Sequence, residues 1–233
     1  MLALFAVLGA VYLIGAIPFG YLIGRLVKGV DIRNFGSGNI GATNVGRVLG
    51  WKWFPVVMLL DLLKGAAPVF LIRYSSLPVD ELLLNRSVLA SLAGLVAMLG
   101  HLFPVYLHFK GGKGVATGAG VIGVLLPLPT LIAAAAFVFV LTLTRYVSLS
   151  SIVGAVTLVV AVFVLDGLGN RSLSDPTSGA WAPALLAVLG AILVVGRHRA
   201  NIARLLEGTE PKIGRQTQPI AQPPDSNTNS SKG

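Results

Sequence analysis

The sequence predicts an all-α integral membrane protein with seven transmembrane helices, and three observations lead to this prediction. Of the 233 residues, 55% are hydrophobic and only 12% are charged. The mean hydropathy is +0.81. The apolar residues gather in runs of roughly 20, which is the length that crosses a bilayer as a helix. A water-soluble globule of this size would carry more charge and would interrupt such runs with polar faces.

Seven apolar segments are predicted to cross the membrane. They are residues 2–23, 50–72, 88–106, 115–126, 130–143, 148–165 and 181–196. Between the fourth and fifth segments, Pro127, Leu128 and Pro129 are interpreted as a turn, because proline lacks an amide donor and restricts the residue before it. One long kinked helix over both segments is the alternative. The first run lacks a basic start and is followed by Arg25 and Lys28, which argues against a cleaved signal peptide.

The basic residues predict how the spans are oriented. With seven spans, fourteen Lys and Arg lie on one side and three on the other, while Lys64 lies inside a span. The larger group is Arg25, Lys28, Arg33, Arg47, Lys52, Lys110, Lys113, Arg145, Arg197, Arg199, Arg204, Lys212, Arg215 and Lys232. The positive-inside rule places this group in the cytoplasm, so the N-terminus is expected outside and the C-terminus inside. Residues 1–213 are expected to form one membrane domain, and the polar residues 214–233 a disordered cytoplasmic tail.

Two cytoplasmic loops concentrate glycines, small polar residues and cations. The first covers residues 31–47 and contains Gly36, Ser37, Gly38, Asn39, Gly41, Thr43, Asn44, Gly46 and Arg47. The glycines let backbone amides approach an anion, and Arg47 adds a forked cation. A flexible hinge is the alternative, but a hinge does not need so many polar side chains. The glycine spacing also matches a dinucleotide-binding fingerprint, which we reject because the flanking segments are membrane spans without a βαβ unit.

The second loop covers residues 100–120 and includes Lys110, Gly111, Gly112, Lys113 and Gly114. Two ammonium groups beside a flexible backbone, at the start of a helix, are typical of a phosphate site. The loop is not a Walker A motif, because no Ser or Thr follows the Gly-Lys pair. Ordinary anchoring of the lysines at the membrane surface is the alternative.

Further polar residues lie at the ends of spans. His198 and Asn201 follow the seventh span on one face of a helix expected to lie along the membrane, although His198 alone could be a surface residue. Ser150 and Ser151 begin the sixth span and could donate to a phosphate or act as an N-cap. His101 is interpreted as a helix-packing residue rather than a base.

Asp61 and Lys64 are three residues apart inside the second span and share a helix face. Each charge costs roughly 3 kcal/mol to place in a membrane, so the two are expected to face protein or water. A structural ion pair is the favoured interpretation. A proton relay is the alternative, but the spans lack a file of further acids.

Three segments together resemble a known family. SGNIGATNVGR, LKGAAP and GHLFPVYLHFKGGKGVAT are similar to the three motifs of the acyl-phosphate-dependent glycerol-3-phosphate acyltransferase family (PlsY). The resemblance implies transfer of a fatty acyl group from acyl phosphate to glycerol 3-phosphate, giving lysophosphatidic acid and phosphate for phospholipid biosynthesis. It further implies a location in the bacterial cytoplasmic (inner) membrane, contact with membrane lipid, no cofactor, metal or nucleic acid, and allows a soluble enzyme that supplies acyl phosphate.

The resemblance also implies which residues act. The catalytic residues would be Ser37, Arg47 and Lys113, and Ser150, Ser151, His198 and Asn201 would bind substrate. The composition of the two loops adds Gly38, Asn39, Thr43, Asn44 and Gly112 as substrate-binding candidates. Cations suit two anionic substrates, and stabilising the oxyanion matters more than acid catalysis because the leaving group is a weak base. The proton acceptor stays open, since no histidine here has an acid five residues later. A transporter of a phosphorylated anion is the alternative function, and it should show inverted repeats.

Overall fold

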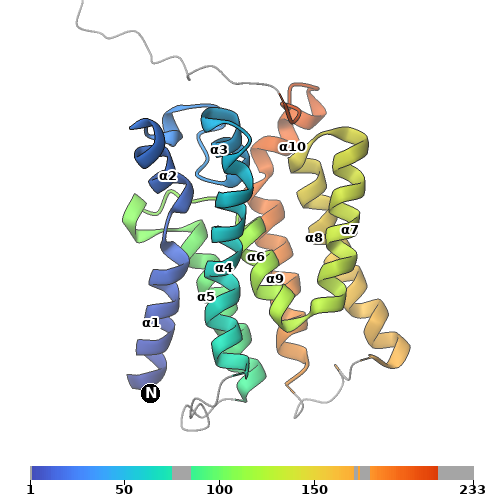
Figure 1. Ribbon diagram of the computed structural model, residues 1–233. Coiled ribbons are helices and arrows are strands. Elements are labelled where there is room, and N and C mark those ends of the chain that lie inside the picture. The colour runs from blue at the N-terminus through green and yellow to red at the C-terminus, as the bar shows by residue number, and fades with distance from the viewer. Residues whose placement is uncertain (1, 75–84, 171–172, 174–178, 215–233) are drawn as a thin grey trace, which may run out of the picture.

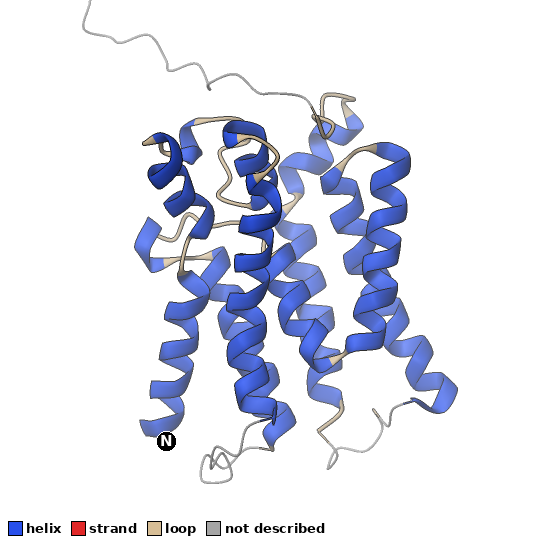
Figure 2. Ribbon diagram, in the orientation of Figure 1, coloured by secondary structure: helices blue, strands red, loops and turns tan. Residues whose placement is uncertain are grey.

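The protein is described by a computed structural model that covers residues 2–74, 85–170, 173 and 179–214 (Figure 1). Helices and loops account for these residues, and no strand occurs among them (Figure 2). The α-helices are α1 (Leu2–Ala16), α2 (Phe19–Lys28), α3 (Ala42–Leu49), α4 (Trp53–Tyr74), α5 (Arg86–Leu102), α6 (Val115–Leu125), α7 (Pro127–Thr144), α8 (Val147–Leu165), α9 (Trp181–Arg197) and α10 (Arg199–Leu206). Short helical turns are η1 (Ile32–Asn34), η3 (Val105–Leu107) and η4 (Asp166–Asn170). The tail predicted at 214–233 lies outside the described residues from 215 onward.

Four helical segments are long and apolar enough to cross a membrane: α4, α5 continued by η3, α7, and α8 continued into η4. Two bent pairs, α1 with α2 and α9 with α10, raise the number to six if each pair is one span. Figure 1 shows the long helices packed side by side. The predicted all-helical membrane architecture is confirmed, with four to six candidate spans in the described residues. The predicted count of seven also requires α6, an apolar helix of 11 residues.

Prolines break the helices at two places. The first predicted span, 2–23, is not continuous, because α1 ends at Ala16 and α2 begins at Phe19, with Pro18 between them. Proline has no amide hydrogen to donate to the helical hydrogen-bond pattern, which explains why the helix is broken here. The second break is confirmed, since α7 runs back along the bundle after α6 (Figure 1). The turn lies at Leu126 and not over Pro127–Pro129, because proline is tolerated in the first turn of a helix.

Two groups of buried apolar side chains hold the helices together. The main core lies among the spans and includes Val69, Ala93, Met98, Val121 and Leu186. A smaller core under residues 31–47 includes Ile32, Ile40, Val45, Val57 and Leu107. The outward helix faces carry exposed apolar side chains, which is expected where lipid is the solvent. The second core therefore fixes the first glycine-rich loop against the bundle.

Candidate active site

The segment 31–47 is more ordered than the sequence suggested. It contains η1 and the helix α3, and α3 carries Thr43, Asn44 and Arg47. Asn44 is only 1% exposed, and its side-chain nitrogen donates to the carbonyls of Ile32, Phe35 and Asn39 at 2.9–3.1 Å. Its side-chain oxygen accepts from the backbone N–H of Ser37 at 2.9 Å. Both polar atoms of the Asn44 amide therefore form hydrogen bonds within the loop. Such a fixed arrangement argues against a flexible hinge.

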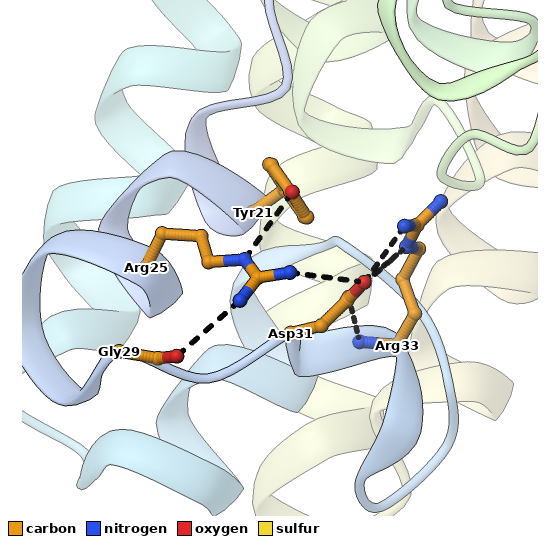
Figure 3. Close-up of polar contacts among 5 residues, drawn as sticks. All are labelled: Tyr21, Arg25, Gly29, Asp31 and Arg33. Atoms are coloured by element: carbon orange, nitrogen blue, oxygen red, sulfur yellow. Dashed lines mark hydrogen bonds and ion pairs between the residues drawn. The ribbon is translucent and has the colours of Figure 1, made fainter.

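A cluster of charges anchors the start of this segment (Figure 3). Asp31 accepts from the backbone N–H and the guanidinium of Arg33, at distances of 2.7–3.2 Å. These hydrogen bonds from Arg33 lower the pKa of Asp31. Arg25 donates to the hydroxyl of Tyr21, and both guanidinium groups lie over the Tyr21 ring. The cluster ties the end of α2 to η1.

Arg47 points from α3 toward the C-terminal segment. Its side chain is 9% exposed, and Nη2 donates to the carbonyl of Pro211 at 3.0 Å. Its Nε is buried and has no hydrogen-bond partner within the described part of the chain. Burial lowers the pKa of Arg47, but a guanidinium remains charged at neutral pH. A buried cationic donor without a partner is a suitable place for an anion.

The second loop is held by contacts to two helices. The N–H of Gly112 donates to the carbonyl of His101 at 3.1 Å. Arg197, at the end of α9, donates to the carbonyls of Gly111 and Gly112 at 3.1 and 3.2 Å. Lys113 follows directly and donates to the side-chain oxygen of Asn201 on α10. The second loop is therefore joined to α9 through Arg197 and to α10 through Asn201.

Lys113 is mostly removed from water. Burial is the largest influence and lowers the pKa of Lys113 to about 8, because the charged form is penalised in a less polar environment. Glu210 acts in the opposite direction, whereas Arg47, Arg197 and Arg204 lower the pKa further. Lys113 is thus a cation surrounded by other cations, and an anionic substrate would relieve that repulsion.

Glu210 is a buried acid that contacts the predicted site residue Asn201, although no motif in the sequence points to it. It is 6% exposed and accepts from Ser148 at 2.7 Å, Asn201 at 2.6 Å and Arg204 at 2.8 Å. Burial raises the pKa of Glu210, but these three hydrogen bonds together lower it below its ordinary value. Glu210 stands in a polar stretch without periodicity. The only available signal was an acid, one of two with Glu207 between residues 197 and 215, among many C-terminal cations.

A cavity of about 230 Å³ opens where these elements meet. Its lining residues are Asn39, Lys113, Gly196, Arg197, Arg199 and Ala200. Three of the six are cations and none is an acid. The volume is several times the roughly 30 Å³ that one water occupies in the liquid. The cavity therefore has the charge and the size for a small phosphorylated molecule.

The remaining predicted residues lie around this centre or apart from it. His198 is 2% exposed with Nδ1 2.7 Å from the carbonyl of Val194, so the alternative of a surface histidine is wrong. Ser150 and Ser151 are buried and donate to carbonyls four residues earlier, and Tyr146 caps α8, so the N-cap alternative is also wrong. Ser37 is exposed, and no hydrogen bond from its hydroxyl to Lys113 or Arg47 occurs among the described residues. Gly38 has a left-handed φ of 67°, which suits glycine.

Comparisons with known proteins show the family to which the chain belongs. Residues 4–208 match the glycerol-3-phosphate acyltransferase family. A glycerol-3-phosphate acyltransferase of Chlorobium phaeobacteroides is 42% identical, with 91% of this chain and 97% of the relative covered. One of Desulforudis audaxviator is 44% identical, with 91% and 96% covered. The crystal structure of PlsY, an integral membrane glycerol 3-phosphate acyltransferase, in its glycerol 3-phosphate form, is 38% identical with a TM-score of 0.76, and the match covers 91% of this chain and 96% of that one. The lysophosphatidic acid form has a TM-score of 0.74 and 36% identity, with the same coverage.

Proposed function

Because the chain belongs to the glycerol-3-phosphate acyltransferase family, we propose that it transfers a fatty acyl group from an acyl phosphate to glycerol 3-phosphate. The products are lysophosphatidic acid and phosphate. The observation that carries this proposal is the cation-lined cavity at which Asn39 of the first loop and Lys113 of the second loop meet. The family relationship makes the chain an acyltransferase of phospholipid synthesis, and it does not favour the alternative of a transporter.

The proposed step needs charge neutralisation more than acid catalysis. A hydroxyl of glycerol 3-phosphate attacks the acyl carbonyl, an ester C–O bond forms, and the bond between the acyl carbon and the phosphate oxygen breaks. The released phosphate can take the hydroxyl proton, so both atoms and charge balance. Arg47 and Lys113 would stabilise the developing charge, and Ser37 would orient the hydroxyl or the oxyanion. Further substrate contacts would come from Thr43, Gly112, Ser150, Ser151, His198 and Asn201.

The size of the cavity supports an acyl phosphate as the donor. A phosphate is compact and fits a space of about 230 Å³ beside several cations. A coenzyme A or carrier-protein thioester would bring a large nucleotide or protein to the same place. The apolar outer faces of the helices would hold the acyl chain in lipid. A separate soluble enzyme would then supply the acyl phosphate.

A comparison of donors tests this proposal. The detergent-purified chain is given glycerol 3-phosphate with either long-chain acyl phosphate or acyl-CoA, and lysophosphatidic acid is measured. We expect turnover with acyl phosphate, little with acyl-CoA, and inhibition by inorganic phosphate. Equal or faster turnover with acyl-CoA would refute the donor assignment but leave the acyltransferase activity intact. Flux of phosphate into liposomes without any product would instead favour a transporter.

The seven-span topology in the bacterial inner membrane is also part of the proposal. The charge distribution supports an outside N-terminus, a cytoplasmic site and a cytoplasmic C-terminus. The chain contains no cysteine, so single cysteines at positions 43 and 80 can be labelled cleanly. In intact cells, an impermeant thiol reagent should label position 80 and leave position 43 unlabelled. The reverse pattern would invert the proposed orientation.

A further inference from the structure

A buried ionic cluster lies next to the active site without being part of it. The predicted ion pair of Asp61 and Lys64 is present on α4, with Lys64 Nζ 2.7 Å from Asp61 Oδ1. His101, in the last turn of α5, lies with Nδ1 3.7 Å from the same carboxylate oxygen. All three residues are only 3–4% exposed. None of them lines the cation-rich cavity.

Lys64 reaches the break between α1 and α2. Its ammonium donates to the carbonyl of Ile17 at 2.7 Å and lies over the ring of Phe19. Pro18 interrupts the helix here, so the carbonyls at the end of α1 lack their usual helical donors. A cation at a helix C-terminus also complements the helix dipole. Lys64 therefore stabilises the break from which α2 departs.

The direction of α2 matters for the first substrate loop. Gly20 on α2 lies so close to the carbonyl of Ile40 that a side chain at position 20 would clash with it. Ile40 directly follows Asn39, which lines the cavity. A change at the break would move α2 and, through this contact, the cavity wall.

His101 connects the same cluster to the second substrate loop. Its imidazole occupies the space where a β-carbon on Gly112 would lie, and its carbonyl accepts from the N–H of Gly112 at 3.1 Å. Gly112 directly precedes Lys113. Figure 1 shows the loop after α5 at the level of the break between α1 and α2. One group of buried polar side chains thus touches the supports of both loops.

We propose that Asp61, Lys64 and His101 form a positioning cluster that places Lys113 and the start of α2 for acyl transfer. The proposal rests on the role proposed above for Lys113. Lys64 fixes α2 through Ile17, Asp61 holds the Lys64 ammonium and faces His101, and His101 fixes Gly112. The three residues do not touch the substrates and act through the loops.

A double variant separates this role from simple fold stabilisation. Replacing a buried ion pair by apolar residues of similar size often leaves stability unchanged, so Asp61→Leu/Lys64→Met should still fold. The carbonyl of Ile17 would nevertheless lose the Lys64 ammonium and keep only the N–H of Phe19, which donates to it at 3.2 Å, and the loops would shift. We expect kcat/KM to fall about 100-fold, which is the order for a catalytic group displaced by about 1 Å. Part of that loss should be a higher KM for glycerol 3-phosphate, whereas a smaller folded fraction lowers the maximal rate and leaves KM unchanged.

The matched control is Leu63→Ala, because Leu63 is the neighbouring residue on α4 and is 46% exposed. It should keep wild-type kinetics and a wild-type unfolding temperature. A folded double variant with kcat/KM within threefold of wild type would overturn the proposal. If the double variant does not fold, His101→Leu is measured in the same way, and the same threefold limit on kcat/KM applies to it. Loss of folding in both variants would show a stability role only, which also overturns the proposal.

Lys113→Ala in the same assay tests the proposed function separately. Full activity of Lys113→Ala would refute the catalytic role of Lys113. Normal activity of the cluster variants, with a large loss in Lys113→Ala, would refute only the positioning role.

Discussion

Asn201 donates a hydrogen bond of 2.6 Å from its side-chain amide to Glu210, while its amide oxygen accepts from Lys113. A neutral amide thus stands between an ammonium and a carboxylate. Direct pairing of Lys113 with Glu210 would occupy the cation that a substrate phosphate needs. The arrangement supplies negative charge near the cations and leaves the Lys113 side of the cavity open to an anion.

Glu210→Gln should destabilise the protein. The amide keeps the shape of the side chain, but its NH2 group replaces one of the two acceptor oxygens, so a donor would face either Arg204 or Asn201 with Ser148. We expect a loss of about 2 kcal/mol in the free energy of unfolding at pH 7, the order for disturbing a buried hydrogen-bonded charge. Chemical denaturation in detergent measures it. Glu207→Gln is the control, because Glu207 is exposed.

The same variant should change how stability depends on pH. The pKa of Glu210 is lowered in the folded protein, so its contribution is present above the unfolded pKa and is lost as pH falls through the folded pKa. Wild type should therefore lose more stability than Glu210→Gln between pH 6 and about pH 3. Identical pH dependence of the two proteins would contradict a charged Glu210 in the folded state.

Lys113 should produce a basic limb in the rate profile. Its pKa is lowered to about 8, so kcat/KM for the free enzyme should decline as pH rises past that value and the ammonium loses its proton. Bound phosphates favour the charged form, so kcat should decline only at higher pH. Lys113→Arg keeps a cation at all these pH values and should remove the limb from whatever activity remains. A limb that persists unchanged in Lys113→Arg would belong to another group.

Arg47→Lys should lose activity without losing the fold. Lysine cannot donate to the carbonyl of Pro211 and to an anion through a planar fork. We expect kcat/KM to fall at least about 100-fold, the order for removing one charged donor to the transition state. Arg25→Lys is the control, because the Arg25 side chain is 49% exposed and lies in the Asp31 cluster. Kinetics near wild type for Arg47→Lys would reduce Arg47 to a surface anchor.

Local patterns predicted much of the fold and the candidate site. The apolar runs predicted an all-helical membrane protein, for which the described residues show four to six candidate spans. The i, i+3 spacing of Asp61 and Lys64 predicted the ion pair. Composition of the two loops predicted that Lys113 and Arg47 serve one site. The structure brings Lys113 to Asn201, 88 residues later.

Features that depend on distant contacts could not be predicted in this way. Glu210 is significant only because Ser148, Asn201 and Arg204 converge on it from α8 and α10. The helix α3 was hidden because Gly46 and its polar residues resemble a loop. Packing on the small core under residues 31–47 outweighs those local preferences. The break at Pro18 carried a local signal, but the apolar run on both sides masked it.

Asn44 was expected to bind substrate, but its side-chain amide forms hydrogen bonds inside the loop. Asn44→Ala leaves the carbonyls of Ile32, Phe35 and Asn39 without their shared donor and the N–H of Ser37 without its acceptor. The carbonyls of Ile32 and Phe35 keep backbone N–H donors, so the Ser37 N–H and the Asn39 carbonyl are affected most. We expect a loss of about 2–3 kcal/mol in local stability, because removing hydrogen bonds from buried polar groups is costly.

Hydrogen exchange measures that loss directly. Amides of residues 32–39 should exchange faster in Asn44→Ala, while the amides of α4 remain protected. Because the loop is then less stable, kcat/KM should fall as well. Asn34→Ala is the control, because Asn34 is exposed in the same segment. Asn44→Asp keeps the acceptor for Ser37 but loses every donor, so it should resemble Asn44→Ala. Normal exchange combined with a large activity loss would instead show that Asn44 contacts the substrate, because a loop that stays folded cannot account for lost catalysis.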